Sequence, residues 1–305
     1  MEEKVYHMPA LLPEAMEALR IKPDGVYVDV TFGGGGHSRA ILERLSPKGH
    51  LYGFDRDLDA VSQAFKDDRF TIVHSDFRYI ENFLRFYGVG QIDGLLADLG
   101  VSFHHFDTAE RGFSFRMEGP LDMRMNRNSA LTAATIVNEY DEESLTGLFR
   151  LYGELKQARR LASAVVAARG VKPIATTGDL LEVVEPLINQ KQRKKELAQV
   201  FQALRIEVNS EMDALESLLN AAVRVIKPEG RLAIITYHSL EDRMVKNFLR
   251  TGNIRGEENK DFFGRNLAPF KPLTSSPIVP DEAEVETNPR SRSAKLRVGL
   301  RVSEG

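Results

Sequence analysis

The chain has 305 residues, 42% of them hydrophobic and 28% charged, with a net charge of −3. These values are typical of a globular protein with one large domain or two ordinary ones, and any nucleic-acid-binding surface on it must be a local basic patch. The absence of cysteine excludes disulfides, thiolate metal sites and cysteine nucleophiles, and the absence of a signal peptide or a long apolar run predicts a cytoplasmic protein without a membrane partner.

Strands and helices alternate over the first hundred residues. An amphipathic helix is predicted over residues 9–20, and strands are predicted over residues 26–30, 50–55, 70–74 and 92–98. Helices are predicted between these strands, over residues 39–45, 57–65 and 80–86. Alternation at this spacing predicts a parallel sheet with right-handed crossovers.

The alternation stops after residue 100. Residues 101–128 are loop-like, and helices are predicted over residues 141–151, 154–169, 177–188 and 193–224, with Thr176 and Asp179 as one helix start. A strand over 230–237 and a helix over 239–249 then return, followed by an extended loop over 252–290 and a final edge strand over 294–302. We therefore predict an α/β core of residues 1–105 and 212–305, interrupted by a helical domain of residues 106–211.

A glycine run follows the first predicted strand. Gly33 to Gly36 stand at its end, and Ser38 is placed to cap the next helix. Strand, glycine turn and helix are how open α/β sheets present backbone N–H groups to a nucleotide-like ligand. A phosphate loop is excluded because no Gly-Lys-Ser/Thr follows, and the dinucleotide fingerprint fits weakly because Ser38 stands at its third glycine.

The third alternative for the glycine loop is S-adenosylmethionine. Its binding sites have an acid inside the first strand followed by spaced glycines, and Asp29, Gly33 and Gly35 fit that spacing, with Thr31 in place of one glycine. Bare glycine backbone lets such a ligand lie close to the chain. Taken singly, a glycine run is also explained by a tight turn, and an acid by a helix cap.

Acidic groups also stand at the ends of the later strands. Asp55 ends the second strand and can accept both ribose hydroxyls, while Asp76 and Phe77 follow the third and suit the adenine. Asp98 ends the fourth strand, where the methyl acceptor lies in such folds. Asp98 either accepts a hydrogen from that acceptor or only touches the cofactor, and the sequence leaves both open.

Eight sequence blocks stand in order along the chain and resemble one family. They include DVTFGGGGHS at residues 29–38, DLGVS at 98–102, FQALRIEVN at 201–209 and YHSLEDR at 237–243; the others are residues 6–14, 110–115, 119–125 and 288–297. Together they closely resemble the bacterial small-subunit ribosomal RNA methyltransferase H family, formerly called MraW, from about residue 6 to residue 302.

The resemblance implies a class I methyltransferase of Rossmann-like fold with an inserted all-helical domain. It implies S-adenosyl-L-methionine as cofactor and methylation of N4 of a decoding-centre cytidine in 16S rRNA, within the 30S subunit. The family's cofactor positions correspond to the following residues: Gly35, Gly36, His37, Asp55, Phe77, Asp98 and His105. His105 stands where the family usually has glutamine, so its contact with the cofactor stays open. Asp98 is the candidate catalytic residue.

Two basic runs are candidates for contact with the RNA backbone. One lies in the predicted insert (Lys191, Arg193, Lys194 and Lys195) and one near the C-terminus (Arg290, Arg292, Lys295 and Arg297). His238 and the acids after it either contact RNA or cap the next helix. We expect no metal, since no His-x-x-x-His pair occurs. The alternative functions are a small-subunit assembly or binding factor that retains the fold without turnover, and a nicotinamide dehydrogenase.

Overall fold

The structure is a computed structural model that describes residues 9–101, 106–258, 260–264 and 266–303. The chain divides into two compact units. One unit comprises the residues up to Gly100 together with those from Asp213 onward, and the other comprises Val101–Met212. We call them the sheet unit and the helical unit.

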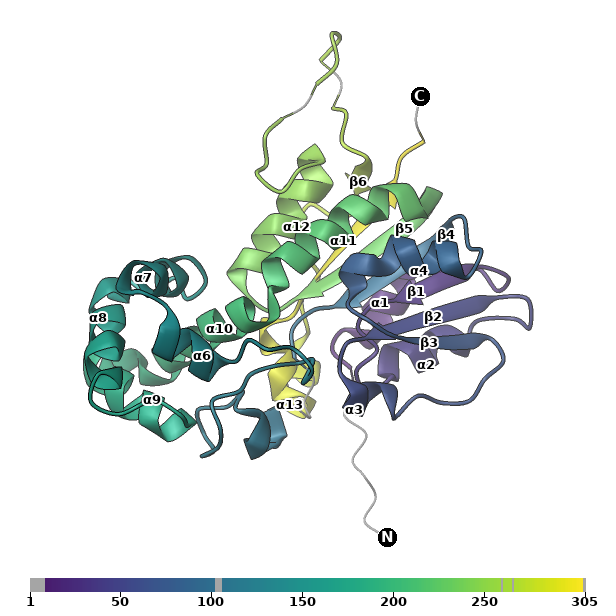
Figure 1. The fold of residues 1–305 in the computed structure, drawn as a ribbon. Coiled ribbons are helices and arrows are strands. Elements are labelled where there is room, and N and C mark those ends of the chain that lie inside the picture. The colour runs from purple at the N-terminus through teal and green to yellow at the C-terminus, as the bar shows by residue number, and fades with distance from the viewer. Residues whose placement is uncertain (1–8, 102–105, 259, 265, 304–305) are drawn as a thin grey trace. The chain divides into compact units, whose positions relative to one another are not determined.

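The sheet unit is built on one seven-stranded sheet (Figure 1). Its strands are β1 (Val26–Asp29), β2 (His50–Asp55), β3 (Phe70–His74), β4 (Ile92–Asp98), β5 (Ile226–Thr236), β6 (Phe270–Pro272) and β7 (Lys295–Arg301). The strand order is β3-β2-β1-β4-β5-β7-β6, with β1 to β5 parallel and β7 antiparallel to both of its neighbours. The predicted parallel sheet is therefore confirmed.

The predicted edge position of the last strand is wrong. β7 lies between β5 and β6, and β6 occupies the edge. β6 falls inside the segment predicted to be an extended loop, which also contains the helix α13 (Glu282–Thr287). A three-residue strand that ends in proline has no measurable alternation, so sequence periodicity could not detect it.

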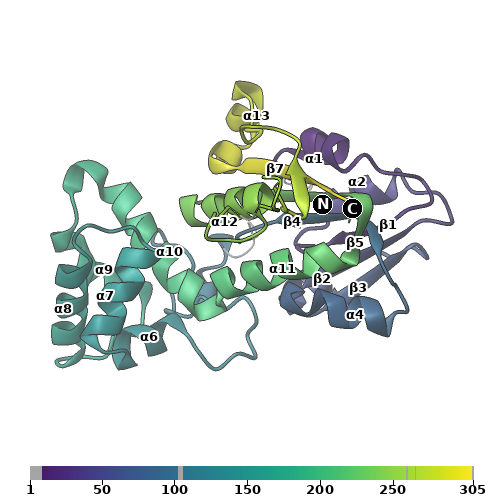
Figure 2. The ribbon, with the colours of Figure 1, turned by 90° about the horizontal axis from the view of Figure 1, so that it is seen from above.

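Two layers of helices cover the sheet (Figure 2). α1 (Leu12–Leu19) and α2 (Gly36–Leu42) pack on one face, against side chains such as Tyr27 and Leu51. α4 (Ile80–Phe86), α11 (Glu211–Val225) and α12 (Ser239–Thr251) pack on the other, against Val28 and Phe54. Successive β1 residues thus point into different cores, as the period of a strand requires.

The helix predicted over residues 57–65 is much shorter in the structure. α3 spans only Leu58–Val61. Phe65 instead packs on Phe70, with ring centroids 4.5 Å apart, and on Phe32, with centroids 5.7 Å apart. Burial of this aromatic cluster beside the glycine loop outweighs continuation of the helix.

The helical unit surrounds a single apolar core. Its helices are α6 (Ala133–Glu139), α7 (Glu142–Leu151), α8 (Ala158–Arg169), α9 (Thr177–Val184) and α10 (Arg193–Asn209). The capping box predicted from Thr176 and Asp179 is confirmed at α9, whereas α6 was not predicted. The long helix predicted over 193–224 is divided at Ser210, whose φ of 47° is left-handed and ends α10.

Short 3₁₀ helices complete the described elements. They are η1 (Phe77–Tyr79), η2 (Ala109–Arg111), η3 (Glu185–Leu187), η4 (Gln190–Gln192) and η5 (Pro289–Ser293). None of the helices in the described part of the chain combines the length and the apolarity that a bilayer span requires.

Candidate functional site

The carboxyl ends of β1, β2, β3 and β4 meet at one edge of the sheet. β1 pairs with β2 on one side and with β4 on the other, and β3 pairs with β2 so that Asp55 lies opposite His74. This edge is where open α/β sheets bind ligands. The predicted residues Gly35, Gly36, His37, Asp55, Phe77 and Asp98 all lie at it, on these strand ends or on the segments that follow them.

A buried carboxylate organises the glycine loop. Only 1% of Asp29 is exposed, and its Oδ1 accepts a hydrogen bond from the Thr31 backbone N–H at 3.1 Å. Its Oδ2 accepts one from the Ser38 hydroxyl at 2.7 Å. The prediction that Ser38 caps the helix is therefore wrong: α2 begins at Gly36 without a side-chain cap, so Ser38 lies inside the helix, and its hydroxyl donates to the buried acid.

Two glycines of the loop are required by its geometry. Gly35 precedes α2 with a φ of 76°, which favours glycine. A Cβ on Gly36 would lie 2.5 Å from Cγ of Pro9, so Gly36 allows the close approach of that segment. A Cβ on Gly34 would meet no atom within 4 Å, so Gly34 is the open part of the loop. Sequence reasoning did not distinguish Gly34 from the other glycines of the run, because the space around a glycine depends on the folded structure.

Asp55 ties the second strand to the loop. Its Oδ2 accepts a hydrogen bond from the Gly33 N–H at 2.8 Å, and its Oδ1 accepts one from the Asp57 N–H at 2.8 Å. A carboxylate has about four lone-pair positions, so these bonds leave it capacity for a ligand's hydroxyl groups. Phe77 lies just after β3, the strand that pairs with β2. It is the half-buried first residue of η1, which Asp76 caps.

The Asp98 carboxylate accepts a hydrogen bond from one side chain and lies near a second. The Tyr237 hydroxyl donates a hydrogen bond to its Oδ1 at 2.8 Å, and Nδ1 of His37 lies 3.7 Å from its Oδ2. The Asp98 N–H donates to Oγ1 of Thr31 at 2.6 Å, which joins β4 to the glycine loop. The Asp98 side chain is 23% exposed, so part of it remains accessible at the sheet edge.

The surroundings of Asp98 favour its protonated form. Burial raises the pKa of Asp98 to about 6; the His37 ring and the Tyr237 hydroxyl oppose the rise, and the nearby Asp29 and Glu241 add to it. Burial and the neighbouring Asp98 charge also raise the pKa of Tyr237, so its hydroxyl stays protonated and acts as a donor. Asp98 thus changes charge in a pH range where most proteins remain folded.

His37 is held inside the sheet unit, and 4% of it is exposed. Its Nε2 lies 3.1 Å from the carbonyl oxygen of Ala10. Because a carbonyl can only accept, Nε2 carries the hydrogen, and Nδ1 is the atom turned towards Asp98. The His37 ring therefore lies beside Asp98 on the interior side, and its 3.7 Å contact is longer than a hydrogen bond.

Sequence reasoning missed Tyr237 as a site residue. It follows β5, immediately beside the strand that carries Asp98. The sequence did indicate that Tyr237 lies at this edge, because β5 is a fifth parallel strand and ends there. However, the direction of the tyrosine hydroxyl depends on strand order, which periodicity does not reveal.

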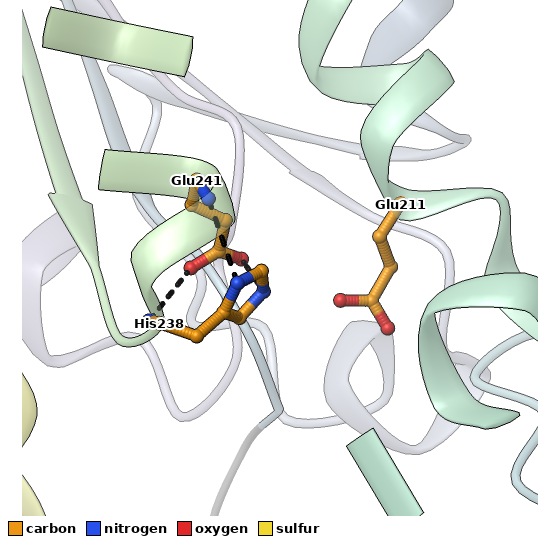
Figure 3. A group of neighbouring side chains, drawn as sticks. All are labelled: Glu211, His238 and Glu241. Atoms are coloured by element: carbon orange, nitrogen blue, oxygen red, sulfur yellow. Dashed lines mark hydrogen bonds and ion pairs between the residues drawn. The ribbon is translucent and has the colours of Figure 1, made fainter. Parts of the chain in front are cut away.

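His238 and Glu241 form the capping box of α12 (Figure 3). Oε2 of Glu241 accepts from the Tyr237 N–H at 3.0 Å, and Nε2 of His238 lies 3.1 Å from Oε1 of Glu241. Of the two predicted roles for this segment, the structure thus supplies the capping role. The remaining predicted position, His105, lies outside the described residues.

The chain is similar to known proteins over nearly its whole length. A family model described as the MraW methylase family matches residues 4–302. A ribosomal RNA small subunit methyltransferase H of Phocaeicola vulgatus is 60% identical over 97% of this chain and 97% of its own. The protein of that name from Parabacteroides distasonis is 60% identical over 99% of this chain and 100% of its own. A solved structure of a putative rRNA methylase from Clostridium thermocellum covers 97% of this chain and 99% of its own, with a TM-score of 0.45 and 10% identity.

The sheet has the strand arrangement predicted for this family. Five parallel strands followed by an antiparallel β7 confirm the predicted class I methyltransferase core. The family model spans nearly all of the sequence, and the two relatives share 60% of its residues. The chain therefore belongs to the MraW methylase family, whose methyl donor is S-adenosyl-L-methionine.

Proposed function

We propose that this protein transfers a methyl group from S-adenosyl-L-methionine to N4 of a decoding-centre cytidine in 16S rRNA, within the 30S subunit. The observation that carries the proposal is the Asp98 carboxylate, accessible at the sheet edge and hydrogen-bonded by Tyr237. The relatives' shared name, ribosomal RNA small subunit methyltransferase H, supports an rRNA substrate.

The residues at the sheet edge fit the cofactor. Gly34, where a Cβ would meet no atom within 4 Å, leaves the backbone bare beside the site. We assign the Asp55 carboxylate to the ribose hydroxyls and Phe77 to the adenine ring. The backbone of Gly35, Gly36 and His37 would line the methionine end, and the acidic edge at Asp98 suits a sulfonium cation. A contact of His105 with the cofactor stays a prediction.

The chemistry required of the protein is alignment and acceptance of a hydrogen. Bound S-adenosyl-L-methionine supplies a methyl group on a good leaving group, so the protein mainly orients the acceptor nitrogen in line with it. The cytosine amine is a poor nucleophile because its lone pair is delocalised into the ring. The ionised Asp98 accepts a hydrogen of this amine and takes up its developing positive charge. The hydrogen bond from the Tyr237 hydroxyl holds the Asp98 carboxylate in place.

Replacing Tyr237 by phenylalanine is expected to move the pH dependence of methyl transfer upward. The hydroxyl stabilises the ionised Asp98, so its loss raises the pKa of Asp98 further. A hydrogen bond to a charged group is worth about 1.5–3 kcal/mol, which corresponds to roughly one pH unit or more. The measurement is kcat/KM for S-adenosyl-L-methionine across pH.

Tyr87→Phe is the matched control for this substitution, because Tyr87 is 39% exposed and lies on another part of the sheet unit. It should leave the pH profile where it is. If Tyr237→Phe lowers thermal stability but leaves the acidic limb at the wild-type pH, Tyr237 supports the fold and does not set the ionisation of Asp98.

We assign recognition of the surrounding RNA to the predicted insert, residues 106–211. The target cytidine must leave its stack to reach the reacting methyl group, as bases do in enzymes that modify them. A separate helical unit with its own core provides a rigid support for contacts with the flanking RNA.

The function is tested with the purified protein, labelled S-adenosyl-L-methionine and 30S particles from a strain lacking the gene. We expect label in N4-methylcytidine, identified by nucleoside mass spectrometry and placed at the decoding centre by RNA fragmentation. Label in another nucleoside would contradict the proposed substrate. Tight binding of the particles without any label would favour the assembly-factor alternative.

A further inference from the structure

Two helix starts in the helical unit bring exposed cations together. α8 begins at Ala158 and α10 begins at Arg193. They are joined by a hydrogen bond of 2.5 Å from Nε2 of Gln157 to Oε2 of Glu196. The exposed basic residues that stand within a few positions of these two helix starts, which we call the α8–α10 basic patch, are Lys156, Arg159, Arg160, Lys191, Lys194 and Lys195.

The second feature of this patch is its lack of ion pairs with the described part of the chain. Within residues 9–101, 106–258, 260–264 and 266–303, the structure shows no ion pair for any of the six. Glu196 instead accepts hydrogen bonds from Gln157 and from the Asn189 N–H. Glu185 is paired with Arg193, a neighbouring cation that we leave out of the patch for this reason.

The C-terminal basic run differs in this respect. Nε of Arg297 lies 2.6 Å from Oδ1 of Asp242, and Arg297 is only 9% exposed. Nζ of Lys295 lies 3.5 Å from Oδ2 of the same carboxylate. Two of the four residues of this run that were predicted to contact RNA therefore join β7 to α12 instead. The cations of the insert are more accessible to an RNA phosphate.

We propose that the α8–α10 basic patch binds the phosphate backbone of the ribosomal RNA. The net charge of the chain is −3, so six exposed cations without an ion pair to the described residues form a local concentration of positive charge. Such cations bind RNA by displacing its counterions, which gives binding without base specificity. The patch would hold the helical unit on RNA that flanks the target. This inference rests on the proposed function.

The experiment compares double substitutions that each remove two positive charges. Lys194→Gln with Lys195→Gln removes them from α10, and Arg159→Gln with Arg160→Gln removes them from α8. Lys48→Gln with Lys66→Gln is the matched control, because these exposed lysines belong to the sheet unit and their side chains form no hydrogen bond or ion pair with the described residues. Affinity for 30S particles is measured from low to high salt.

Each patch variant is expected to weaken binding about tenfold or more at low salt and to reduce the slope of log K against log salt by about 1–2, since each phosphate contact contributes about 0.7–0.9. The control should keep the wild-type slope, and all three should keep the wild-type affinity for S-adenosyl-L-methionine. Wild-type slopes in both patch variants would overturn the patch proposal alone, provided that the wild-type protein methylates the particles. Wild-type protein that does not bind the particles would contradict the proposed function as well.

Discussion

Asp98→Asn is expected to lower the rate of methyl transfer by about 10²–10⁴-fold at saturating cofactor and 30S particles. General-base groups contribute a factor of this size. The amide keeps the shape of the carboxylate and can still accept from Tyr237, but it has no charge with which to stabilise the developing cation on the amine. The measurement is a single-turnover rate, which separates methyl transfer from product release.

The same substitution should remove the acidic limb of the pH profile. Since the pKa of Asp98 is raised to about 6, the ionised form is lost as the pH falls through this value, and kcat/KM of the wild type should decline below it. The small residual rate of Asp98→Asn should not show this decline. Asp68→Asn makes the same chemical change at an exposed position and should leave both rate and profile unaltered.

The outcome also separates the two roles left open for Asp98. If it only touches the cofactor, Asp98→Asn weakens binding of S-adenosyl-L-methionine while the saturated single-turnover rate stays near that of the wild type. If it accepts a hydrogen from the amine, the rate falls even when both ligands are saturating.

The parts of the site that could be predicted are those at the ends of strands. Asp55 and Asp98 each close an apolar run, and parallel strands bring their carboxyl ends to one edge whatever their order. Gly33 to Gly36 mark the turn between strand and helix for the same local reason. The local sequence pattern, together with the meeting of parallel strand ends at one edge, was therefore sufficient to predict these residues.

The parts that could not be predicted depend on contacts between elements distant in sequence. Ser38 has the side chain of a cap, but α2 begins before it at Gly36, and its hydroxyl donates to the buried Asp29 at the end of β1. Tyr237 reaches Asp98 only because β5 is placed next to β4. Strand order also decides that β7 is internal, and alternation along a single strand carries no information on its neighbours.

Asp55→Ala is expected to weaken the affinity for S-adenosylhomocysteine, used as a stable analogue of the cofactor, by about 10²-fold or more. Hydrogen bonds to a charged group are worth about 1.5–3 kcal/mol each, and two ribose hydroxyls would lose their acceptor. Asp55 also accepts from the backbone N–H of Gly33, however, so the substitution loosens the glycine loop too. A loss of affinity alone does not show which of these contacts is responsible.

An analogue without the ribose hydroxyls separates the two causes. Calorimetry should show that the wild-type protein binds 2′,3′-dideoxy S-adenosylhomocysteine far more weakly than the parent compound, because the analogue leaves Asp55 without its ligand partners. Asp55→Ala should bind the two compounds with nearly equal affinity, since neither can then use the carboxylate. A variant that still discriminates as strongly as the wild type would have lost only the loop contact to Gly33, and the ribose would have to be assigned to another residue.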